Sequence, residues 1–556
     1  MTVALLPEGT STTELAGLGM SPGLLSAGLG NVPAAQTYLD ISQGNRVFDS
    51  LYDSALPREV GGGICGPAYS RAVVERAESA PADIVPGLLA TTLRRAGEGC
   101  EVRGLRLRQL GALVGGLRGD DLVVAVERAP PATNGALTIG IAGRGFDGNL
   151  TSDSTRMDGY VLSTDIGPTV LGRFGIAVPA QMSGQPIRSE GDVDVTALES
   201  LGARMSVISE RRGPVIGVSL LVWLLALALT LAVTRGPRAR FVVKLVGLSI
   251  VFLPLALLLG AALEPSQAVE RLIAMSGAPL LALLAVVVLS GYRALAVASG
   301  LVVLAYAVDV IAGSPLTSLS LLGPNPGLGV RFYGIGNELE AILAVLTIAG
   351  TGAWLAGFVQ RAPRSPGAAV FLAVGLFFAA VFAAGRFGAD VGAAIVLPIG
   401  AAVAASWVAT PRRHAALFIV AVPLAMIAFV AFVDLVSGAN AHLTRSVLDA
   451  GGLGDLGDVA QRRLQLSAHS FVRPVVLFFL PVIAALAVLA IARRDRLWAL
   501  LEDHPVMQAG LLGALAATIV GTLANDSGAL LLEIGTAYLL VFVAFAWAES
   551  SPAARV

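Results

Sequence analysis

The stretch that decides the fold runs from residue 214 to residue 234 and reads PVIGVSLLVWLLALALTLAVT. It carries no charged residue, and a helix needs about 20 such apolar residues to cross the roughly 30 Å hydrocarbon core of a bilayer. Stretches of the same kind follow as far as residue 548. They predict an all-α polytopic membrane bundle of about eleven spans, at 214–234, 241–263, 273–291, 294–313, 335–357, 367–385, 389–409, 415–436, 474–492, 508–525 and 528–548.

The composition agrees with a membrane protein. Of the 556 residues, 55% are hydrophobic and 14% are charged, whereas soluble domains carry about 25% charged residues. Ala, Gly, Leu and Val dominate the helical half, and small residues let helices pack closely in lipid. The net charge of −1 provides no electrostatic attraction for nucleic acid. We therefore expect the lipid bilayer as a partner, and no nucleic acid.

The basic residues of the short loops set the predicted orientation, because Lys and Arg concentrate on the cytoplasmic side. They follow every second span: Arg235, Arg238, Arg240 and Lys244, then Arg293, then Arg361 and Arg364, then Arg412 and Arg413, then Arg493, Arg494 and Arg496. This pattern predicts a multi-pass protein of the plasma membrane with a cytoplasmic tail at 549–556. Residues 1–213 then form an extracytoplasmic domain.

An exported domain needs an export signal, and the opening MTVALLPE has neither a charged n-region nor a long apolar h-region. Residues 2–6 look instead like the first strand of a domain. We expect a signal anchor upstream of the first residue given. The alternative is an odd number of miscounted spans, with the domain inside.

Residues 1–213 alternate between strand-like and helix-like segments. Residues 2–6, 122–127 and 136–142 are β-rich apolar runs, and 67–77, 84–96 and 166–174 have helical spacing. Such alternation predicts an α/β domain with a largely parallel sheet.

Both ends of this domain resemble the alkaline phosphatase superfamily. The closing segments are GRGFDGNLTSDSTR at 143–156, GYVLSTDIGPTVLGRFG at 159–175 and PAQMSGQP at 179–186. They are similar to the superfamily's Asp-x-x-Pro-Thr helix after the last strands. The opening VALLPEG at 3–9 is similar to its first strand, and Glu8 takes the place of the metal-binding Asp there. The string FYGIGNE at 332–338 resembles one in uncharacterised bacterial membrane proteins of the cell envelope that pair such a domain with a multi-span bundle.

The resemblance implies a two-metal phosphohydrolase site held by His and Asp, and the chain departs from that pattern. Its four histidines, His414, His442, His469 and His504, all lie in the membrane half. We therefore expect no metal and no cofactor. The domain is then catalytically degenerate and has a binding or structural role. The alternative is Mg²⁺ or Mn²⁺ on carboxylates such as Glu8, Asp120 and Asp121.

Two cysteines, Cys65 and Cys100, lie in the N-terminal domain. In an oxidising compartment they can form a disulfide. Two free buried thiols are the equal alternative.

Polar residues gather near one end of the predicted bundle, the outer end in this orientation. They occur in Gly-punctuated motifs, RFYGIGNE at 331–338, GRFGADVG at 385–392 and NDSG at 525–528. Glycine allows close backbone approach and broken helices around a protein-lined cavity, and arginine suits phosphate or carboxylate recognition. The hypothesis is a substrate pocket formed by Arg331, Asn337, Glu338, Glu340, Arg386, Asp390, Asn525 and Asp526. The alternative is that these acids simply reach interfacial water from helix ends.

Three functions follow for the chain. The leading one is an envelope protein that binds or processes a lipid-linked or phosphorylated substrate at the outer leaflet, and whether it is an enzyme stays open. The first alternative is a transporter or lipid flippase, although the sequence has no clear inverted repeat. The second is a non-catalytic membrane scaffold.

Overall fold

The structure, a computed structural model, describes residues 1–61, 63–66, 68–129, 132–133, 135–359, 364–409, 415–436, 464–465, 467–468, 470–472 and 474–550. The chain forms two compact units. The first contains Met1–Ser209 and Asn325–Tyr333, and the second contains Glu210–Pro324 and Gly334–Val556. The division lies inside one continuous helix, α7 (Val195–Val233), which also contains the predicted boundary at residue 213.

The first unit is an α/β domain. Its helices are α1 (Thr12–Gly17), α2 (Ala34–Gln43), α3 (Arg71–Glu78), α4 (Leu88–Arg95), α5 (Leu107–Val114) and α6 (Ile166–Arg173). Its strands are β1 (Thr2–Leu6), β2 (Ser21–Ser26), β3 (Val32–Pro33), β4 (Glu101–Gly104), β5 (Val123–Glu127), β6 (Ala132–Thr133), β7 (Ala136–Ala142), β8 (Asn149–Ser152), β9 (Tyr160–Leu162) and β10 (Ile187–Glu190). The three predicted strands are present as β1, β5 and β7. The helices predicted at 67–77, 84–96 and 166–174 are present as α3, α4 and α6, and α3 and α4 begin four residues later than predicted.

Six strands form the main sheet, in the order β4-β1-β5-β7-β2-β9. The pairs β1–β4, β1–β5 and β2–β9 are parallel, but β7 runs antiparallel to both β5 and β2. Five strands therefore run in one direction, as expected of a largely parallel sheet, and β7 alone runs against them and makes the sheet mixed. The short connection between β5 and β7 explains this, because only antiparallel neighbours can be joined without a long crossover.

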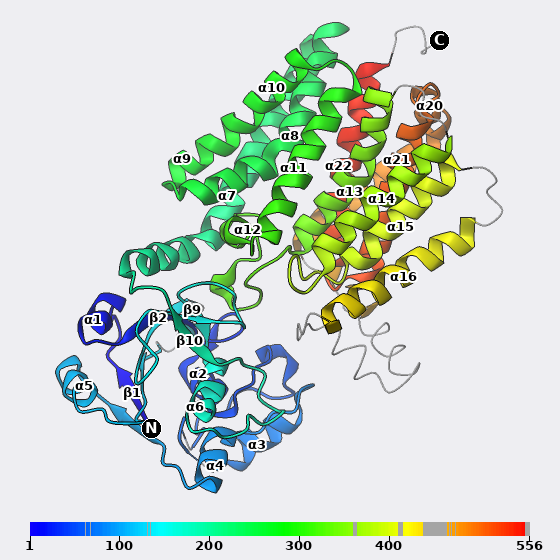
Figure 1. Ribbon diagram of the computed structural model, residues 1–556. Coiled ribbons are helices and arrows are strands. Elements are labelled where there is room, and N and C mark those ends of the chain that lie inside the picture. Colours follow the sequence, from blue (N-terminus) through cyan, green and yellow to red (C-terminus); the bar gives the residue numbers. More distant parts are fainter. Residues whose placement is uncertain are drawn as a thin grey trace. The chain divides into compact units, whose positions relative to one another are not determined.

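Helices cover both faces of this sheet. In β1, Ala4 and Leu6 face the cluster that contains Leu15 of α1 and Leu110 of α5. The alternate residue Val3 faces the larger cluster of α2, α4 and α6. This is the two-residue period of a strand buried on both sides, and Figure 1 shows α1 and α5 on the opposite side of the sheet from α2, α4 and α6.

The first unit also includes a segment that lies far along the chain, Asn325–Tyr333. Its Leu328 carbonyl accepts a hydrogen bond from the Gly30 amide (2.8 Å). Its Gly329 carbonyl accepts one from Arg46 Nη2 (2.9 Å). Gly329 has φ +71°, and a Cβ there would overlap the Gly28 carbonyl, so this close approach requires glycine. The sequence alone did not predict this insertion.

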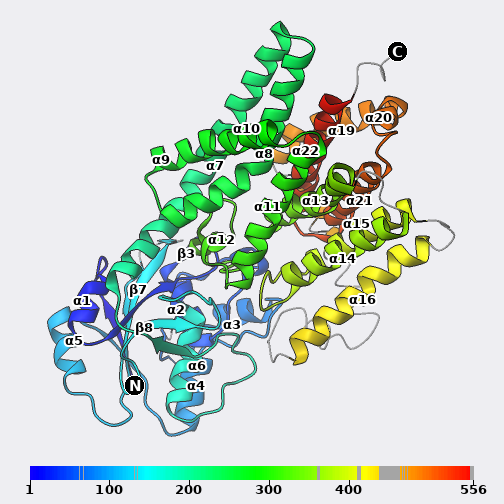
Figure 2. The same cartoon turned by 45° about the horizontal axis from the view of Figure 1, so that its top comes forward.

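The second unit is helical. After α7 come α8 (Pro237–Leu263), α9 (Gln267–Leu272), α10 (Ala278–Val288), α11 (Tyr292–Ile311), α12 (Pro315–Leu319), α13 (Asn337–Trp354), α14 (Arg364–Ala383), α15 (Ala393–Val408), α16 (Ala415–Val436), α19 (Pro474–Ala492), α20 (Arg494–Leu500), α21 (Pro505–Ala524) and α22 (Gly528–Glu549). Short π-helical turns, Ile273–Gly277 and Leu355–Val359, lie between α9 and α10 and after α13. Helices α13, α14, α15 and α21 lie side by side in Figures 1 and 2.

Within the described residues, nine helices are long and apolar enough to cross a membrane. The chain is thus suited to a multi-pass membrane protein. The predicted spans at 389–409 and 474–492 are shorter apolar helices, Ala393–Val408 and Phe479–Ala492. The first is shorter because residues 385–392 form an irregular turn, which leaves Asp390 outside the helix. Most of the predicted tail, at 551–556, and the predicted loop arginines Arg361, Arg412 and Arg413 lie outside the described residues.

Candidate functional site

Two of the Gly-punctuated motifs pack directly against each other in the helical unit. The Ile335 amide donates to the Gly388 carbonyl (3.0 Å), and the Gly334 amide donates to Ser314 Oγ (2.9 Å). Gly334 has φ +76°, and a Cβ there would overlap the Gly388 carbonyl. Glycine is therefore required where the loop before α13 crosses the turn before α15.

The first turn of α13 is hydrogen-bonded to the connection between α21 and α22. Asn525 Nδ2 donates to Glu340 Oε2 (2.7 Å) in a buried contact, and Asn337 Nδ2 donates to Asp526 Oδ1 (3.0 Å) at the surface. The paired residues are 189 positions apart for Asn337 and Asp526, and 185 positions apart for Glu340 and Asn525. Two motifs that are distant in the sequence therefore form one polar site.

The turn before α15 completes this site. Asp390 Oδ1 accepts a hydrogen bond from the Gly392 amide (3.1 Å), in the turn that leads into α15. A Cβ on Gly392 would overlap the Glu340 carboxylate. Glu340 and Asp390 are 2% and 4% exposed, so both carboxylates lie inside the bundle. We call Asn337, Glu338, Glu340, Asp390, Asn525 and Asp526 the polar cluster.

The two predicted arginines lie in separate parts of the chain. Arg386 is exposed, and Arg331 belongs to the segment of the first unit. A cation that was not predicted from the sequence also lies at the cluster: Nη1 of Arg212 in α7 is 3.5 Å from Glu338 Oε1. Arg212 Nη2 also donates to the Gly323 carbonyl. One sequence signal could have indicated Arg212. The pair Arg211-Arg212 directly precedes the first apolar stretch, at the predicted outer end of that span, where arginine is less common than at the cytoplasmic end.

Another acid near the same end has a structural explanation. Asp309 of α11 accepts hydrogen bonds from the amides of Leu316 (3.0 Å) and Thr317 (2.7 Å). It caps the first turn of α12, which accounts for its burial. Asp309 is thus not needed for a binding site.

The chemistry of the polar cluster is that of carboxylates and amides. Its exposed or half-buried members Asp526, Asn337 and Glu338 lead to the buried Glu340, Asp390 and Asn525. Such groups accept hydrogen bonds from hydroxyl and ammonium groups, and the two amides also donate. Near a helix N-terminus, carboxylates are also stabilised by the helix dipole, which explains how they tolerate burial.

The predicted metal-binding carboxylates of the α/β domain do not come together. Glu8 is exposed at the end of β1, and the neighbouring Glu127 is occupied by the amides of Gly9 (2.7 Å) and Thr138 (2.9 Å). Asp121 caps a turn through the Arg118 amide (3.0 Å). In the part of the chain that the structure describes, no group of three or more His, Cys, Asp or Glu side chains is arranged to hold a metal ion.

The Asp-x-x-Pro-Thr motif has a structural role in this chain. Asp165 Oδ1 accepts hydrogen bonds from Ser154 Oγ (2.6 Å) and the Gln185 amide (2.9 Å), and Oδ2 accepts one from the Leu162 amide (2.9 Å). Burial raises the pKa of the Asp165 carboxyl. Thr169 Oγ1 then donates to the Asp165 carbonyl (2.6 Å). The motif therefore holds β9, α6 and the strand segment after them together.

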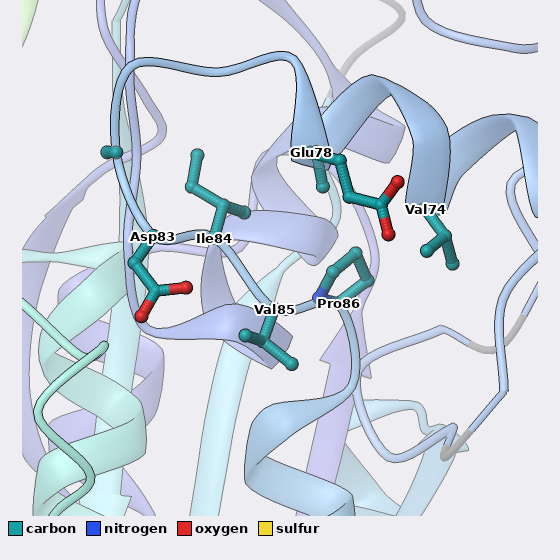
Figure 3. Close-up of a pocket in the computed structure, with 8 residues that line it drawn as sticks. Val74, Glu78, Asp83, Ile84, Val85 and Pro86 are labelled. Carbon is teal, nitrogen blue, oxygen red and sulfur yellow. The ribbon is translucent and has the colours of Figure 1, made fainter.

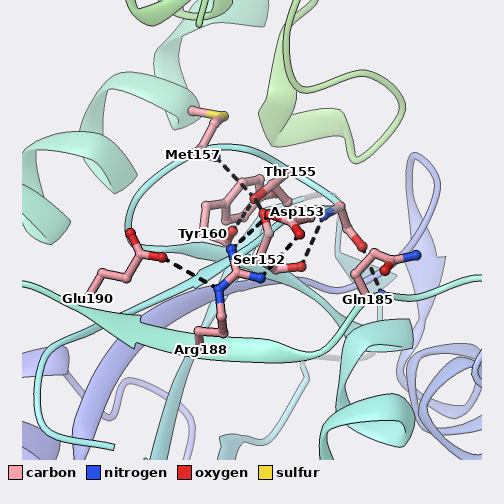
Figure 4. Close-up of polar contacts among 9 residues, drawn as sticks. Ser152, Asp153, Thr155, Met157, Tyr160, Gln185, Arg188 and Glu190 are labelled. Atoms are coloured by element: carbon pink, nitrogen blue, oxygen red, sulfur yellow. Dashed lines mark hydrogen bonds and ion pairs between the residues drawn. The ribbon is translucent and has the colours of Figure 1, made fainter. Parts of the chain in front are cut away.

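The two-stranded antiparallel sheet of β8 and β10 carries an exposed ion-pair network. Arg188 lies between Asp153 (2.8 Å) and Glu190 (3.5 Å), and Thr155 Oγ1 donates to the Tyr160 carbonyl (Figure 4). Exposed pairs of this kind contribute about 0–1 kcal/mol each. The network thus orients this small sheet and provides no reactive group.

A second buried polar centre lies on α2. Asp40 is 1% exposed, and its Oδ1 accepts hydrogen bonds from Gln36 Nε2 (2.7 Å) and Gln43 Nε2 (3.2 Å). Burial raises the pKa of Asp40 to about 7, against the opposing effect of Gln36, Arg46 and Arg76. This carboxyl is therefore poised to change charge near neutral pH.

A pocket of about 480 Å³ lies beside α3. Figure 3 shows Val74, Ile84, Val85 and Pro86 lining it, with the carboxylates of Glu78 and Asp83 at its two sides. Its lining holds neither a nucleophile nor a general base paired with one. It is thus unsuited to the phosphohydrolase chemistry that the resemblance implied.

Cys65 and Cys100 are joined by a disulfide in the structure, with Cα atoms 5.5 Å apart. The bond ties the segment before α3 to the residue that precedes β4.

Comparison of the chain with protein-family models, with curated proteins and with solved structures found no match. The functional argument therefore rests on the residues and their geometry.

Proposed function

We propose that this protein is a cell-envelope membrane protein whose polar cluster binds the headgroup of a lipid-linked substrate. One observation carries the proposal. The Glu340–Asn525 hydrogen bond (2.7 Å) joins two broken-helix motifs, far apart in the sequence, into one site inside a largely apolar bundle. Charged residues inside a membrane bundle are costly, and they commonly mark a functional site.

The chemistry of the cluster favours a neutral, hydroxyl-rich headgroup over a phosphate. Four of its members are carboxylic acids, Glu338, Glu340, Asp390 and Asp526, and Arg212, a cation at the cluster, already contacts Glu338. A phosphate would meet like charges, whereas sugar hydroxyls would donate to the carboxylates and accept from the amides of Asn337 and Asn525.

For the α/β domain we propose an alkaline-phosphatase-like fold. The domain has a structural or ligand-binding role and does not hydrolyse phosphate esters. The support is that the domain has no histidine and that its Asp165 and Thr169 are used in structural hydrogen bonds. We place this domain and the polar cluster on the extracytoplasmic side, on the strength of the loop arginines.

A transporter is the second candidate, and the burial of Glu340 and Asp390 favours it. Buried carboxylates that face the interior of a bundle are used as proton or ion relays in transporters. A transporter would carry the same headgroup across, with a proton flux coupled to it.

The test uses the full-length protein in lipid nanodiscs and native mass spectrometry. The probes are a diglucosyl diacylglycerol and a phosphatidic acid of the same acyl chains. We expect the wild type to retain the glycolipid, and Glu340→Gln and Asn525→Ala to reduce glycolipid retention without reducing that of phosphatidic acid. Arg496→Gln, an exposed change on α20, is the control.

Glycolipid retention that neither variant reduces, or an equal reduction for both lipids, would refute the headgroup proposal and leave a scaffold. A proton flux in proteoliposomes that Glu340→Gln abolishes would instead favour the transporter.

A further inference from the structure

Four helices of the second unit run from the polar cluster to a second polar site. Helices α13 and α22 begin at the cluster, and α11 and α21 end near it. At their other ends lie Gly357, Glu549, Tyr292 and His504, which line one pocket with Ser290, Gly291, Arg293 and Ala356. Helix α22 has 22 residues, about 33 Å at about 1.5 Å per residue. The two polar sites are thus separated by about the thickness of a bilayer core.

The pocket has a volume of about 260 Å³. Small-molecule sites usually measure roughly 300–1,000 Å³, so this one fits a headgroup-sized fragment. It lies at the arginine-rich end of the bundle, the end that carries α20 in Figure 1. It is separate from the polar cluster in both position and charge.

Arg293 provides the cation of this pocket. Its Nε donates to the Gly357 carbonyl (2.9 Å), and its guanidinium lies 5.3 Å from the centre of the Phe358 ring. A Cβ on Gly357 would press on the backbone of Arg293, so glycine allows this approach. Its two Nη groups make no hydrogen bond to any residue that the structure describes. The guanidinium is therefore oriented with its donor fork available, the arrangement that suits phosphate.

Two aromatic residues complete the donor set. Tyr292 and His504 pack edge to face with ring centres 4.8 Å apart. Neither the Tyr292 hydroxyl nor the His504 imidazole hydrogen-bonds to a side chain or backbone group in the described part of the chain. Burial lowers the pKa of His504, so at neutral pH its ring offers a hydrogen bond and no charge.

The acid of the pocket is already neutralised. Glu549 forms an ion pair with Lys244, and Lys244 also lies over the Phe545 ring at 5.8 Å. Asp503 is exposed beside His504. With Glu549 paired, Arg293 leaves the lining with a net positive charge.

We propose that this pocket binds a phosphate group, either free or as the headgroup of an anionic lipid. The Arg293 fork would bind two phosphate oxygens, and Tyr292 and His504 would donate to the others. Basic pockets between membrane helices are the usual place for anionic headgroups. The inference does not rest on the proposed function, because it uses other residues at the opposite ends of the helices.

The experiment measures binding of phosphatidic acid to the full-length protein in nanodiscs of phosphatidylcholine, with inorganic phosphate as competitor. We expect Arg293→Gln to weaken phosphatidic acid binding roughly tenfold or more, the effect of losing one charge-assisted hydrogen bond. Tyr292→Phe removes the hydroxyl alone and should weaken binding by a smaller factor. If Arg293→Gln fails to fold, Tyr292→Phe still tests whether the pocket binds phosphatidic acid.

Arg496→Gln, which removes an exposed arginine at the same end, is the matched control and should bind like the wild type. Competition by inorganic phosphate would identify the free anion as a ligand, and its absence would identify the lipid headgroup, each in support of the pocket. An equal loss in Arg293→Gln and Arg496→Gln would overturn the proposal, because it would assign binding to surface charge. No effect of either pocket variant would overturn it as well.

Discussion

The buried carboxyl of Asp40 makes the stability of the α/β domain depend on pH. It lies on α2 with two glutamine amides on the same oxygen, at 2.7 and 3.2 Å. Burial raises its folded-state pKa from 3.8 to about 7. Because the folded pKa is raised, this contribution to stability is fully present below about pH 3.8 and is lost as the pH rises through about 7.

The magnitude follows from the shift. A gap of about three pKa units corresponds to about 4 kcal/mol, at about 1.4 kcal/mol per unit. Asp40→Asn removes the titrating group and keeps the shape. Between pH 5 and 7, the free energy of unfolding of the variant relative to that of the wild type should rise by about 1.4 kcal/mol per pH unit. This difference should level off above pH 7.

The assay is pulse proteolysis of the full-length protein in increasing urea, read as cleavage of the α/β domain at pH 5, 6, 7 and 8. The two proteins are compared at each pH, so the pH dependence of the protease cancels. Asp83→Asn, an exposed carboxyl of the same domain, controls for the loss of one negative charge.

A difference that does not change with pH would refute this reasoning. A difference of the opposite sign would show that Arg46 and Arg76 outweigh burial and hold Asp40 ionised.

Three further outcomes are expected. Gly334→Ala should destabilise the helical unit by about 1–2 kcal/mol because of the positive φ, and by about 1–3 kcal/mol more because the new Cβ overlaps a backbone carbonyl. Gly313→Ala should show only the cost of the positive φ, since nothing lies within 4 Å of a Cβ placed there. Equal midpoints of thermal unfolding in detergent would contradict this. Asn525→Ala should cost about 1.5–3 kcal/mol by removing the donor to Glu340, and Asn525→Asp should cost more because like charges then meet; an Asp variant as stable as the Ala variant would be evidence against the contact. Cys65→Ser should cost the α/β domain about 4 kcal/mol, because its disulfide closes a loop of 35 residues, and wild type measured with reductant should match the variant.

The candidate site was predictable in its residues and less so in its arrangement. The glycine-flanked acids and amides stood out because charge is rare in apolar stretches. Their pairing, Glu340 with Asn525 and Asn337 with Asp526, depends on which helices pack together, and one sequence without its contacts does not specify that. The same limit explains why Arg212, which lies on the cluster in the structure, was missed.

In the α/β domain, local patterns predicted the elements, and tertiary structure decided their directions. The runs at 2–6, 122–127 and 136–142 are strands because β-branched and apolar residues alternate there. The antiparallel direction of β7 follows from its short connection to β5. The alternation of apolar residues predicts a strand but does not give its direction.

By itself, the sequence determined that this chain has a soluble-type domain followed by a bundle of apolar helices. Composition and run length suffice for that, because the bilayer's thickness imposes a minimum length on every span. Only the tertiary structure decided that residues 325–333 belong to the α/β domain, and that Arg293, Tyr292 and His504 share one pocket. The physical reason is that such contacts join segments hundreds of residues apart, and close packing and hydrogen bonding in the folded chain select them.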